Sequence, residues 1–293
     1  MKLIDLIRQE RFSLSFEVFP PKTDASLADV RAATTEVARL NPDFVSVTFG
    51  AGGTGSRLTL EIAESIHRAT GVETLAHLTC VGADRASILG YLRALKENGI
   101  DNVMALRGDF PQGMSAADMD AAVYPHASDL IREIRAFGGF CIGAACYPEV
   151  HPESANQAED IRRLRDKVEA GADFLTTQMF FDNNLLYSFL YKLREAGVTV
   201  PVIPGIMPIT SASQVARAVK LSGSFMPRRF TSLVDRFGSD PAAMKQAGII
   251  YATDQIIDLF ANGIRHVHVY TMNKPDVAGA IQSNLSAMLG SSL

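Results

Sequence analysis

The stretch Ser13–Pro21, SLSFEVFPP, decides the fold prediction. Its alternation predicts a β-strand, because Leu14, Phe16 and Val18 fall on one face. Glu17 falls on the other face, near the strand end, since the two following prolines do not continue a central strand. Burying an ionised carboxylate without a partner costs roughly several kcal/mol, so a strand that carries one commonly uses it. A glutamate exposed to water on an edge strand is the alternative.

One unit recurs along the rest of the chain: an amphipathic run, a glycine and an apolar, β-rich run. Glycine ends helices well because it tolerates positive φ. The predicted strands cover residues 13–19, 44–49, 74–80, 102–107, 140–146, 173–179, 201–206 and 266–271. Such alternation within 293 residues predicts an α/β fold, a closed (β/α)8 TIM barrel of parallel strands.

We expect a single domain over residues 1–293. A short amphipathic helix is predicted at the N-terminus, and an extended connection, residues 207–265, precedes the eighth strand. Within that connection we predict helices near 211–222 and 241–262, with Ser211 and Gln214 forming a capping box. Residues 225–240 form an inserted segment between these helices.

Composition excludes several classes of function. A net charge of −4 and a pI near 5.9 argue against nucleic acid or an anionic membrane as partner. No apolar run approaches the roughly 20 residues that span a bilayer, and the N-terminus does not read as a signal peptide. Three cysteines without CxxC spacing indicate reduced thiols and a cytoplasmic protein.

Polar residues gather at the carboxyl ends of the predicted strands, where barrels of this kind assemble their active sites. The opposite ends carry mostly turn residues, and this asymmetry predicts a catalytic barrel. The polar residues are Glu17, Thr48, His77, Thr79, Arg107, Gly108, Asp109, Tyr147, Glu149, His151, Thr177, Gln178, Asp182, Tyr270, Thr271, Asn273 and Lys274.

A glycine-rich segment follows the second strand. Gly50, Gly52 and Gly55 match the dinucleotide-binding pattern GxGxxG. The acidic residue expected at the end of the next strand is missing, which disfavours a Rossmann domain. A loop whose backbone approaches a ligand stays open as an interpretation.

Two further patterns have both a functional and a structural interpretation. His266 and His268 share a strand face and could pair on a metal, but no third ligand is near in sequence, so we expect hydrogen bonding. Cys146 and His151 suggest a thiol nucleophile with a base, whereas a buried, inert cysteine is the more usual case. We therefore predict no metal site.

Eight segments resemble the methylenetetrahydrofolate reductase family, flavin enzymes that make 5-methyltetrahydrofolate. They are SFEVFPPK, DFVSVTFGAGG, HLTC, ALRGD, CYPEVHPES, TTQMFFD, VIPGIMPI and VYTMN, in family order from about residue 13 to 274. The resemblance implies a bacterial-type chain with the catalytic domain alone, and it favours a homo-oligomer.

The resemblance also implies FAD over the barrel mouth. By family analogy the residues that line it are Thr48, His77, Arg107, Gly108, Asp109, Tyr147, His151, Asp160 and Lys167. Arg163 and Asp166 depart from the family pattern, and Lys274 stands where relatives carry arginine.

The implied reaction is the reduction of 5,10-methylenetetrahydrofolate by NAD(P)H in ping-pong fashion through FAD. Opening the five-membered ring of the folate needs a proton at the departing nitrogen, and we assign Glu17 as the general acid. Asp109 is expected beside the flavin and pterin, and Gln178 and Lys274 are expected to bind the substrate. Whether NADH or NADPH is the donor stays open.

Two other functions stay open. A different barrel enzyme, such as an aldolase or isomerase with a phosphate site, would purify colourless, and no strand end before Lys274 offers a Schiff-base lysine. A folate-binding flavoprotein subunit that depends on a partner for electrons would carry FAD without oxidising NAD(P)H.

Overall fold

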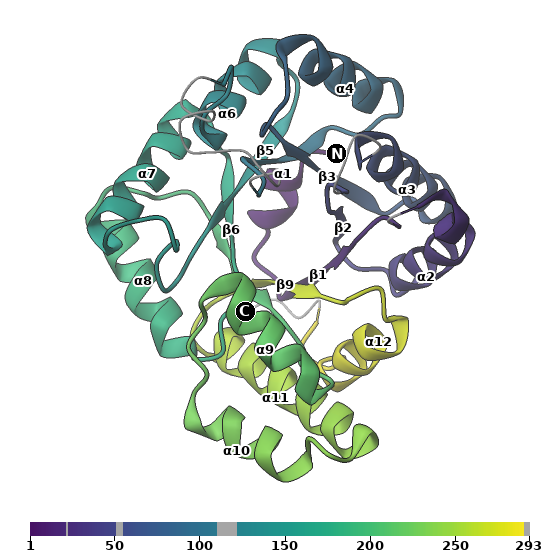
Figure 1. Cartoon of the computed structure of the whole chain (residues 1–293), viewed down its shortest axis with the longest axis vertical. Coiled ribbons are helices and arrows are strands. Elements are labelled where there is room, and N and C mark those ends of the chain that lie inside the picture. Colours follow the sequence, from purple (N-terminus) through teal and green to yellow (C-terminus); the bar gives the residue numbers. More distant parts are fainter. Residues whose placement is uncertain (22, 51–54, 110–121, 290–293) are drawn as a thin grey trace.

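Parallel strands form a ring, and helices cover its outside (Figure 1). This computed structural model describes residues 1–21, 23–50, 55–109 and 122–289. The strands are β1 (Ser13–Val18), β2 (Phe44–Val47), β3 (Glu73–Thr79), β4 (Asn102–Leu106), β5 (Cys141–Cys146), β6 (Phe174–Thr177), β7 (Val202–Ile203), β8 (Gly205–Ile206) and β9 (His266–Tyr270).

The ring closes through Pro204. The hydrogen-bonded order runs β7-β6-β5-β4-β3-β2-β1-β9-β8, and the two end strands of that order are separated in sequence only by this proline. Proline has no N–H to donate, but its carbonyl accepts from the backbone N–H of His268 at 2.8 Å. The predicted strand 201–206 therefore changes partner at Pro204, from β6 to β9, and the predicted barrel is confirmed.

Helices fill the connections between the strands. They are α1 (Leu3–Ile7), the 3-10 turn η1 (Asp24–Ser26), α2 (Leu27–Arg39), α3 (Gly55–Thr70), α4 (Arg85–Glu97), α6 (Ala127–Phe137), α7 (Gln157–Ala170), α8 (Asn183–Glu195), α9 (Ala212–Ser222), α10 (Arg228–Phe237), α11 (Pro241–Ala261) and α12 (Pro275–Asn284). The helices expected near 211–222 and 241–262 are confirmed as α9 and α11. At the start of α9, the Ser211 N–H donates to Gln214 Oε1 at 3.1 Å, as the capping-box prediction requires.

The inserted segment between α9 and α11 contains a helix that the sequence analysis did not assign. Helix α10 buries Phe230, whose ring stacks on Phe181 at 5.2 Å and meets Tyr251 edge-on at 4.9 Å. These contacts come from α11 and from the loop after β6, so they exist only in the folded chain.

The amino end of the ring is closed by α1. Leu3, Ile4 and Ile7 are buried there, and the backbone N–H of Leu3 donates to Asn102 Oδ1 at 2.8 Å. These residues pack against inward-facing apolar side chains at Phe44, Leu75, Met104, Cys141, Phe174 and Ile203. The predicted N-terminal helix is thus confirmed, and it closes the amino end of the barrel. The polar inward-facing residues lie toward the carboxyl end.

Candidate active site

A polar column runs up the inside of the barrel below Glu17. Ser15 Oγ lies 2.7 Å from His268 Nδ1, and Ser46 Oγ lies 2.9 Å from His268 Nε2. Ser46 Oγ also donates to Glu17 Oε2 at 3.4 Å. One proton arrangement satisfies all three contacts: Ser15 donates to Nδ1, Nε2–H donates to Ser46, and Ser46 donates to the carboxylate. The column thereby fixes the Glu17 side chain from beneath.

The two histidines of β9 are used in hydrogen bonding, as expected from the sequence. His268 belongs to this column, and His266 Nδ1 contacts Ser13 Oγ. Within the described part of the chain, no group of three or more potential ligands is placed to hold a metal ion.

Glu17 lies at the upper end of the column, on the central strand of the predicted site. Its side chain is 22% exposed, so the carboxyl group is neither sealed in the core nor free in bulk water. Its backbone carbonyl accepts from Thr271 Oγ1 at 2.6 Å, which ties the end of β1 to the end of β9. The edge-strand alternative is excluded, because β1 pairs on both sides, with β2 and β9.

His77 faces Glu17 from β3. Its Nε2 lies 3.6 Å from Glu17 Oε2. Burial lowers the pKa of His77 to about 4; the Glu17 carboxylate opposes this shift, and the nearby His268 adds to it. The contact at neutral pH therefore joins a carboxyl group and an uncharged imidazole, not an ion pair. Among the described residues, His77 Nε2 is a buried atom without a hydrogen-bond partner.

A second part of the mouth carries cationic groups. Arg107, which follows β4, donates hydrogen bonds to both carboxylate oxygens of Glu153, from Nη1 at 2.5 Å and from Nη2 at 2.7 Å. This hydrogen bonding raises the pKa of the guanidinium. Gly108 follows with φ at +92°, and a Cβ there would lie 2.8 Å from the Val81 side chain. Glycine is therefore required for both the backbone conformation and the packing.

Asp109 is exposed and follows Gly108 directly. It lies near the ring of Tyr147: burial raises the pKa of this phenol, and the negative charge of Asp109 adds to the rise. The phenol also has a side-chain hydrogen bond with Gln178. The structure thus brings the ends of β4, β5 and β6 together at these three predicted residues.

Helix α7 contributes Asp160 and Lys167, which both turn toward the end of β5. Asp160 is buried and accepts from the His151 backbone N–H at 3.2 Å. Lys167 Nζ donates to the Ala145 carbonyl at 2.9 Å, and burial lowers the pKa of this ammonium group. Burial also lowers the pKa of His151, whose ring meets Tyr147 edge-on at 4.6 Å.

The two positions on α7 that depart from the family pattern point elsewhere. Arg163 pairs with Glu159 one turn earlier on the helix, and Asp166 is exposed. The departures therefore fall outside the inward-facing side that carries Asp160 and Lys167.

The remaining predicted residues lie at the rim. The Thr48 N–H donates to the Val18 carbonyl at 3.0 Å, and the Thr48 carbonyl accepts from Thr59 Oγ1 at 2.9 Å. Lys274 Nζ donates to Thr210 Oγ1 at 3.0 Å. The glycine-rich loop expected to approach a ligand lies largely outside the described residues, at positions 51–54.

Sequence reasoning missed two residues of the mouth, Glu153 and Phe225. Glu153 is the partner of Arg107, and it lies in the same CYPEVHPES segment as His151, which was the available signal. Glu149 accepts from the Phe225 backbone N–H at 2.8 Å. This bond draws the loop after α9 to the mouth and leaves Phe225 56% exposed there. No sequence pattern pairs positions so far apart.

The cysteines do not support the thiol alternative. Cys80, Cys141 and Cys146 are free and buried. Burial raises the pKa of Cys80 to about 12 and that of Cys146 further, so these thiols stay protonated and poorly nucleophilic.

A ring of parallel strands with one end plugged and the other lined by an acid, a neutral histidine and cations is that of a (β/α)8-barrel enzyme. The family model for methylenetetrahydrofolate reductase matches residues 2–286. This chain belongs to the methylenetetrahydrofolate reductase family.

Relatives of known name agree with this assignment. The 5,10-methylenetetrahydrofolate reductase of Escherichia coli is 33% identical, over 96% of this chain and 93% of its own length. The 5,10-methylenetetrahydrofolate reductase of Pectobacterium carotovorum is 34% identical, over 93% of this chain and 90% of its own length. A probable methylenetetrahydrofolate reductase (NADH) of rice is 36% identical over 97% of this chain; the chain spans about half the length of this and the other plant relatives.

A solved structure shares the fold. An uncharacterised Clostridium thermocellum protein that binds two copies of 5-methyl-5,6,7,8-tetrahydrofolic acid superposes with a TM-score of 0.70 at 13% identity, covering 98% of this chain and 99% of that one. No helix among the described residues has the length and apolar character needed to cross a bilayer.

Proposed function

We propose that this chain reduces 5,10-methylenetetrahydrofolate to 5-methyltetrahydrofolate with NAD(P)H as electron donor, using FAD and working in the cytoplasm. The observation that carries the proposal is the position of Glu17, held at the barrel mouth by Ser46 and facing an uncharged His77. Family membership supports the reaction, and this geometry supports the assignment of Glu17 as its acid.

The residues present fit FAD. Arg107 and Lys167 supply cationic donors suited to a diphosphate, and the unpartnered Nε2 of His77 is a buried polar atom suited to a ring heteroatom. Thr48, Gly108, Tyr147, His151 and Asp160 complete the residues that would hold the group. When bound, FAD supplies two-electron hydride chemistry between the nicotinamide and the folate.

Glu17 is the proposed proton donor. The folate must open its five-membered ring to an iminium ion before it accepts hydride, and opening requires a proton on the departing nitrogen. A carboxyl group that is 22% exposed, with one oxygen anchored by Ser46, keeps its other oxygen available to a substrate in the mouth. His77, 3.6 Å away and uncharged at neutral pH, places no cation beside this carboxyl group.

Three other residues are assigned to the substrate side. Asp109, an exposed carboxylate beside Tyr147, would stabilise the iminium cation electrostatically. Gln178 offers both an acceptor and two donors to the pterin edge, and Lys274 offers a cation on the opposite rim.

The experiment is the absorption spectrum of the purified protein, followed by anaerobic addition of NADH or NADPH and then of methylenetetrahydrofolate. The proposal expects a yellow protein that is bleached by one or both nucleotides and regains its colour with the folate. A colourless protein that binds no added FAD would favour a different barrel enzyme. A yellow protein that neither nucleotide bleaches would favour a subunit that takes electrons from a partner.

A further inference from the structure

The polar column below Glu17 contains three side chains to which the proposed reaction assigns no role. Ser15, Ser46 and His268 are buried, so water does not compete for the hydrogen bonds between them. A buried donor or acceptor that lacks a partner is costly, and the direction of one hydrogen bond therefore fixes the direction of the next. The column can thus control where the proton of Glu17 lies.

The His268 ring is held in place by two other rings. Phe44 of β2 stacks on it at 5.5 Å between ring centres, and Tyr270 meets it edge-on at 5.7 Å. In this position Nδ1 faces Ser15 Oγ at 2.7 Å and Nε2 faces Ser46 Oγ at 2.9 Å. An uncharged imidazole has one N–H donor and one acceptor nitrogen, so it accepts from one serine and donates to the other.

The distances favour the tautomer that carries its proton on Nε2. In that tautomer Ser15 donates to Nδ1 at 2.7 Å, and Nε2–H donates to Ser46 at 2.9 Å. In the opposite tautomer Nδ1–H donates to Ser15, which must turn its own proton to the Val267 carbonyl at 3.4 Å. A hydroxyl hydrogen bond of that length is weak, so the opposite tautomer leaves the Ser15 proton with a poor partner.

The neighbouring ionisable groups agree with this tautomer. Glu17 Oε2 lies 3.9 Å from His268 Nε2, so the negative charge of the ionised carboxylate attracts a proton to that nitrogen. His77 is uncharged at neutral pH. Burial and the nearby Glu17 raise the pKa of the Tyr270 phenol well above its usual range, so this group is neutral as well. Neither His77 nor Tyr270 therefore opposes the effect of Glu17.

We propose that His268 is a positioning residue which, as the Nε2–H tautomer, directs the acidic proton of Glu17 to Oε1. Because Ser46 accepts from Nε2–H, its own proton donates to Glu17 Oε2 at 3.4 Å. The oxygen that accepts this bond is the carbonyl oxygen of the acid, which leaves the hydroxyl at Oε1. Ser46 and His77 both lie nearest to Oε2, so Oε1 is the oxygen left for a substrate. This assignment rests on the proposed function, in which Glu17 is the proton donor.

The same arrangement serves the acid before and after the step. When the Oε1–H bond breaks, an N–H bond forms at the departing nitrogen of the folate, and Glu17 is left as a carboxylate. Ser46 continues to donate to Oε2, now to a charged oxygen, which makes a stronger hydrogen bond. No group in the column has to turn during proton transfer, as a preorganised site requires. In the opposite tautomer Ser46 would donate to the imidazole, and the acidic proton would point at Ser46 and away from the folate.

The first test reads the tautomer by 15N NMR of the histidine side chains in the purified protein at pH 7. Loss of signals in His268→Gln assigns those of His268. We expect a lone pair on Nδ1 and a proton on Nε2. A proton on Nδ1 alone, or on both nitrogens, overturns the proposal. The spectrum needs no turnover, so a protein that fails to reduce the folate refutes the proposed function and leaves this measurement intact.

The second test removes the donor to Nδ1. Ser15→Ala should shift His268 toward protonation at Nδ1 and slow the folate half-reaction by about tenfold, a factor typical of one hydrogen bond. Oxidation of NAD(P)H should keep its wild-type rate. Ser15→Thr, which keeps the hydroxyl group, should restore both the tautomer and the folate rate. A Ser15→Ala variant that folds, by circular dichroism, and keeps the wild-type tautomer and folate rate contradicts the proposal.

The matched control lies two residues earlier on the same strand. Ser13 is paired in register with His266 as Ser15 is with His268, and Ser13 Oγ contacts His266 Nδ1. This pair lies toward the amino end of the barrel, away from Glu17. Ser13→Ala should therefore leave the His268 tautomer and the folate half-reaction unchanged. Equal slowing by Ser13→Ala and Ser15→Ala would show a structural effect and would remove the positioning role.

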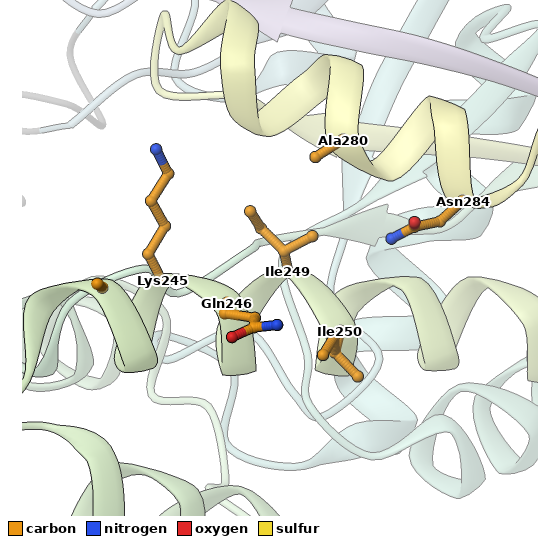
Figure 2. Close-up of a pocket in the computed structure, with 7 residues that line it drawn as sticks. Lys245, Gln246, Ile249, Ile250, Ala280 and Asn284 are labelled. Carbon is orange, nitrogen blue, oxygen red and sulfur yellow. The ribbon is translucent and has the colours of Figure 1, made fainter.

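A second control tests the effect of a remote charge. Gln246 is exposed on α11, where it lines a hollow of about 470 Å³ between α11 and α12 on the outside of the barrel (Figure 2). Gln246→Glu adds a carboxylate there and should change neither the His268 tautomer nor the folate rate. A tautomer shift in Gln246→Glu would show that the overall charge of the protein, and not the contact with Ser15, sets the position of the proton.

Discussion

Glu17 Oε2 lies 3.6 Å from His77 Nε2, across the interior of the barrel from β1 to β3. The imidazole is uncharged at neutral pH, because burial lowers its pKa to about 4. The pair therefore joins a carboxyl group to a neutral ring, at the point where Ser46 ends a chain of hydrogen bonds from Ser15 and His268. In the proposed function, Glu17 is the member of this pair that donates the proton.

Glu17→Gln should separate the two half-reactions. The amide keeps the shape of the side chain but has no acidic proton, so folate reduction should slow by about 10²–10⁴-fold, the usual contribution of a general acid. Oxidation of NAD(P)H should stay near the wild-type rate, as measured by anaerobic stopped-flow absorbance. Glu73→Gln, at the opposite end of β3, is the control and should change neither rate. Equal slowing of both half-reactions by Glu17→Gln would remove the acid assignment.

The low pKa of His77 makes stability depend on pH. Between pH 6.5 and about 4 the unfolded chain binds a proton at this residue and the folded chain does not, so the free energy of unfolding falls as pH is lowered. From pH 7 to pH 5 the loss from His77 alone is about 2 kcal/mol. Urea unfolding of the wild type and of His77→Gln, at pH 7 and at pH 5, measures this loss of unfolding free energy. His151 and His266, whose pKa values are also lowered by burial, act in the same direction in both proteins and cancel. An identical pH dependence in the variant would contradict the prediction.

The strands and their polar ends could be predicted from the sequence, because the signals are local. Alternation in SLSFEV and a glycine before most of the strands mark the elements, and parallel strands bring Glu17, His77 and Arg107 to one end by geometry alone. The partner of each residue could not be predicted in this way. Glu149 binds the backbone of Phe225, 76 residues away, and this pairing depends on the path of a loop.

Helix α10 shows a different limit of prediction from the sequence. Its apolar residues Phe230 and Phe237 have helical spacing, but its arginines and the preceding Pro227 also suit an exposed loop. The packing of Phe230 between Phe181 and Tyr251 selects the helix, and that pocket exists only once α11 is in place. Tertiary contacts thus decide the structure where the local sequence suits a helix and a loop equally well.

Arg107→Lys should weaken FAD retention while leaving the fold intact. Lysine keeps the charge but loses the planar fork, which suits both Glu153 and a phosphate group. We expect an increase of about tenfold in the FAD dissociation constant, equal to about 1.4 kcal/mol, measured by fluorescence titration of the apoprotein. Arg85→Lys is the matched control, because Arg85 makes a similar contact with Glu133 on the outer surface. An effect of the same size at both positions would argue against a direct contact of Arg107 with the cofactor.

Asp109→Asn should make the bound flavin easier to reduce. Removing a negative charge from the mouth favours uptake of electrons, so the midpoint potential should rise by some tens of millivolts, where 30 mV corresponds to about 1.4 kcal/mol for two electrons. The folate half-reaction should slow, because the iminium cation loses a stabilising charge. Dye-coupled reduction gives the potential and stopped-flow absorbance gives the rate. A wild-type potential together with wild-type rates would show that Asp109 is only a turn residue.

Gly248→Ala should destabilise the barrel strongly, although α11 would otherwise favour alanine. A Cβ at Gly248 would lie 1.8 Å from the Ile209 carbonyl oxygen, so α11 or the segment after β8 must move. Overpacking of this kind costs about 1–3 kcal/mol or more. In contrast, Gly90→Ala on α4 meets no atom within 4 Å and should stabilise by about 0.5–1 kcal/mol, since glycine is the poorer helix former. Urea unfolding of the two variants compares the same chemical change in a crowded and in an open helix. Movement near Ile209 also shifts Thr210, which holds Lys274, so Gly248→Ala should raise the KM for the folate as well. A stability equal to that of Gly90→Ala would show that α11 does not pack this closely on the segment after β8.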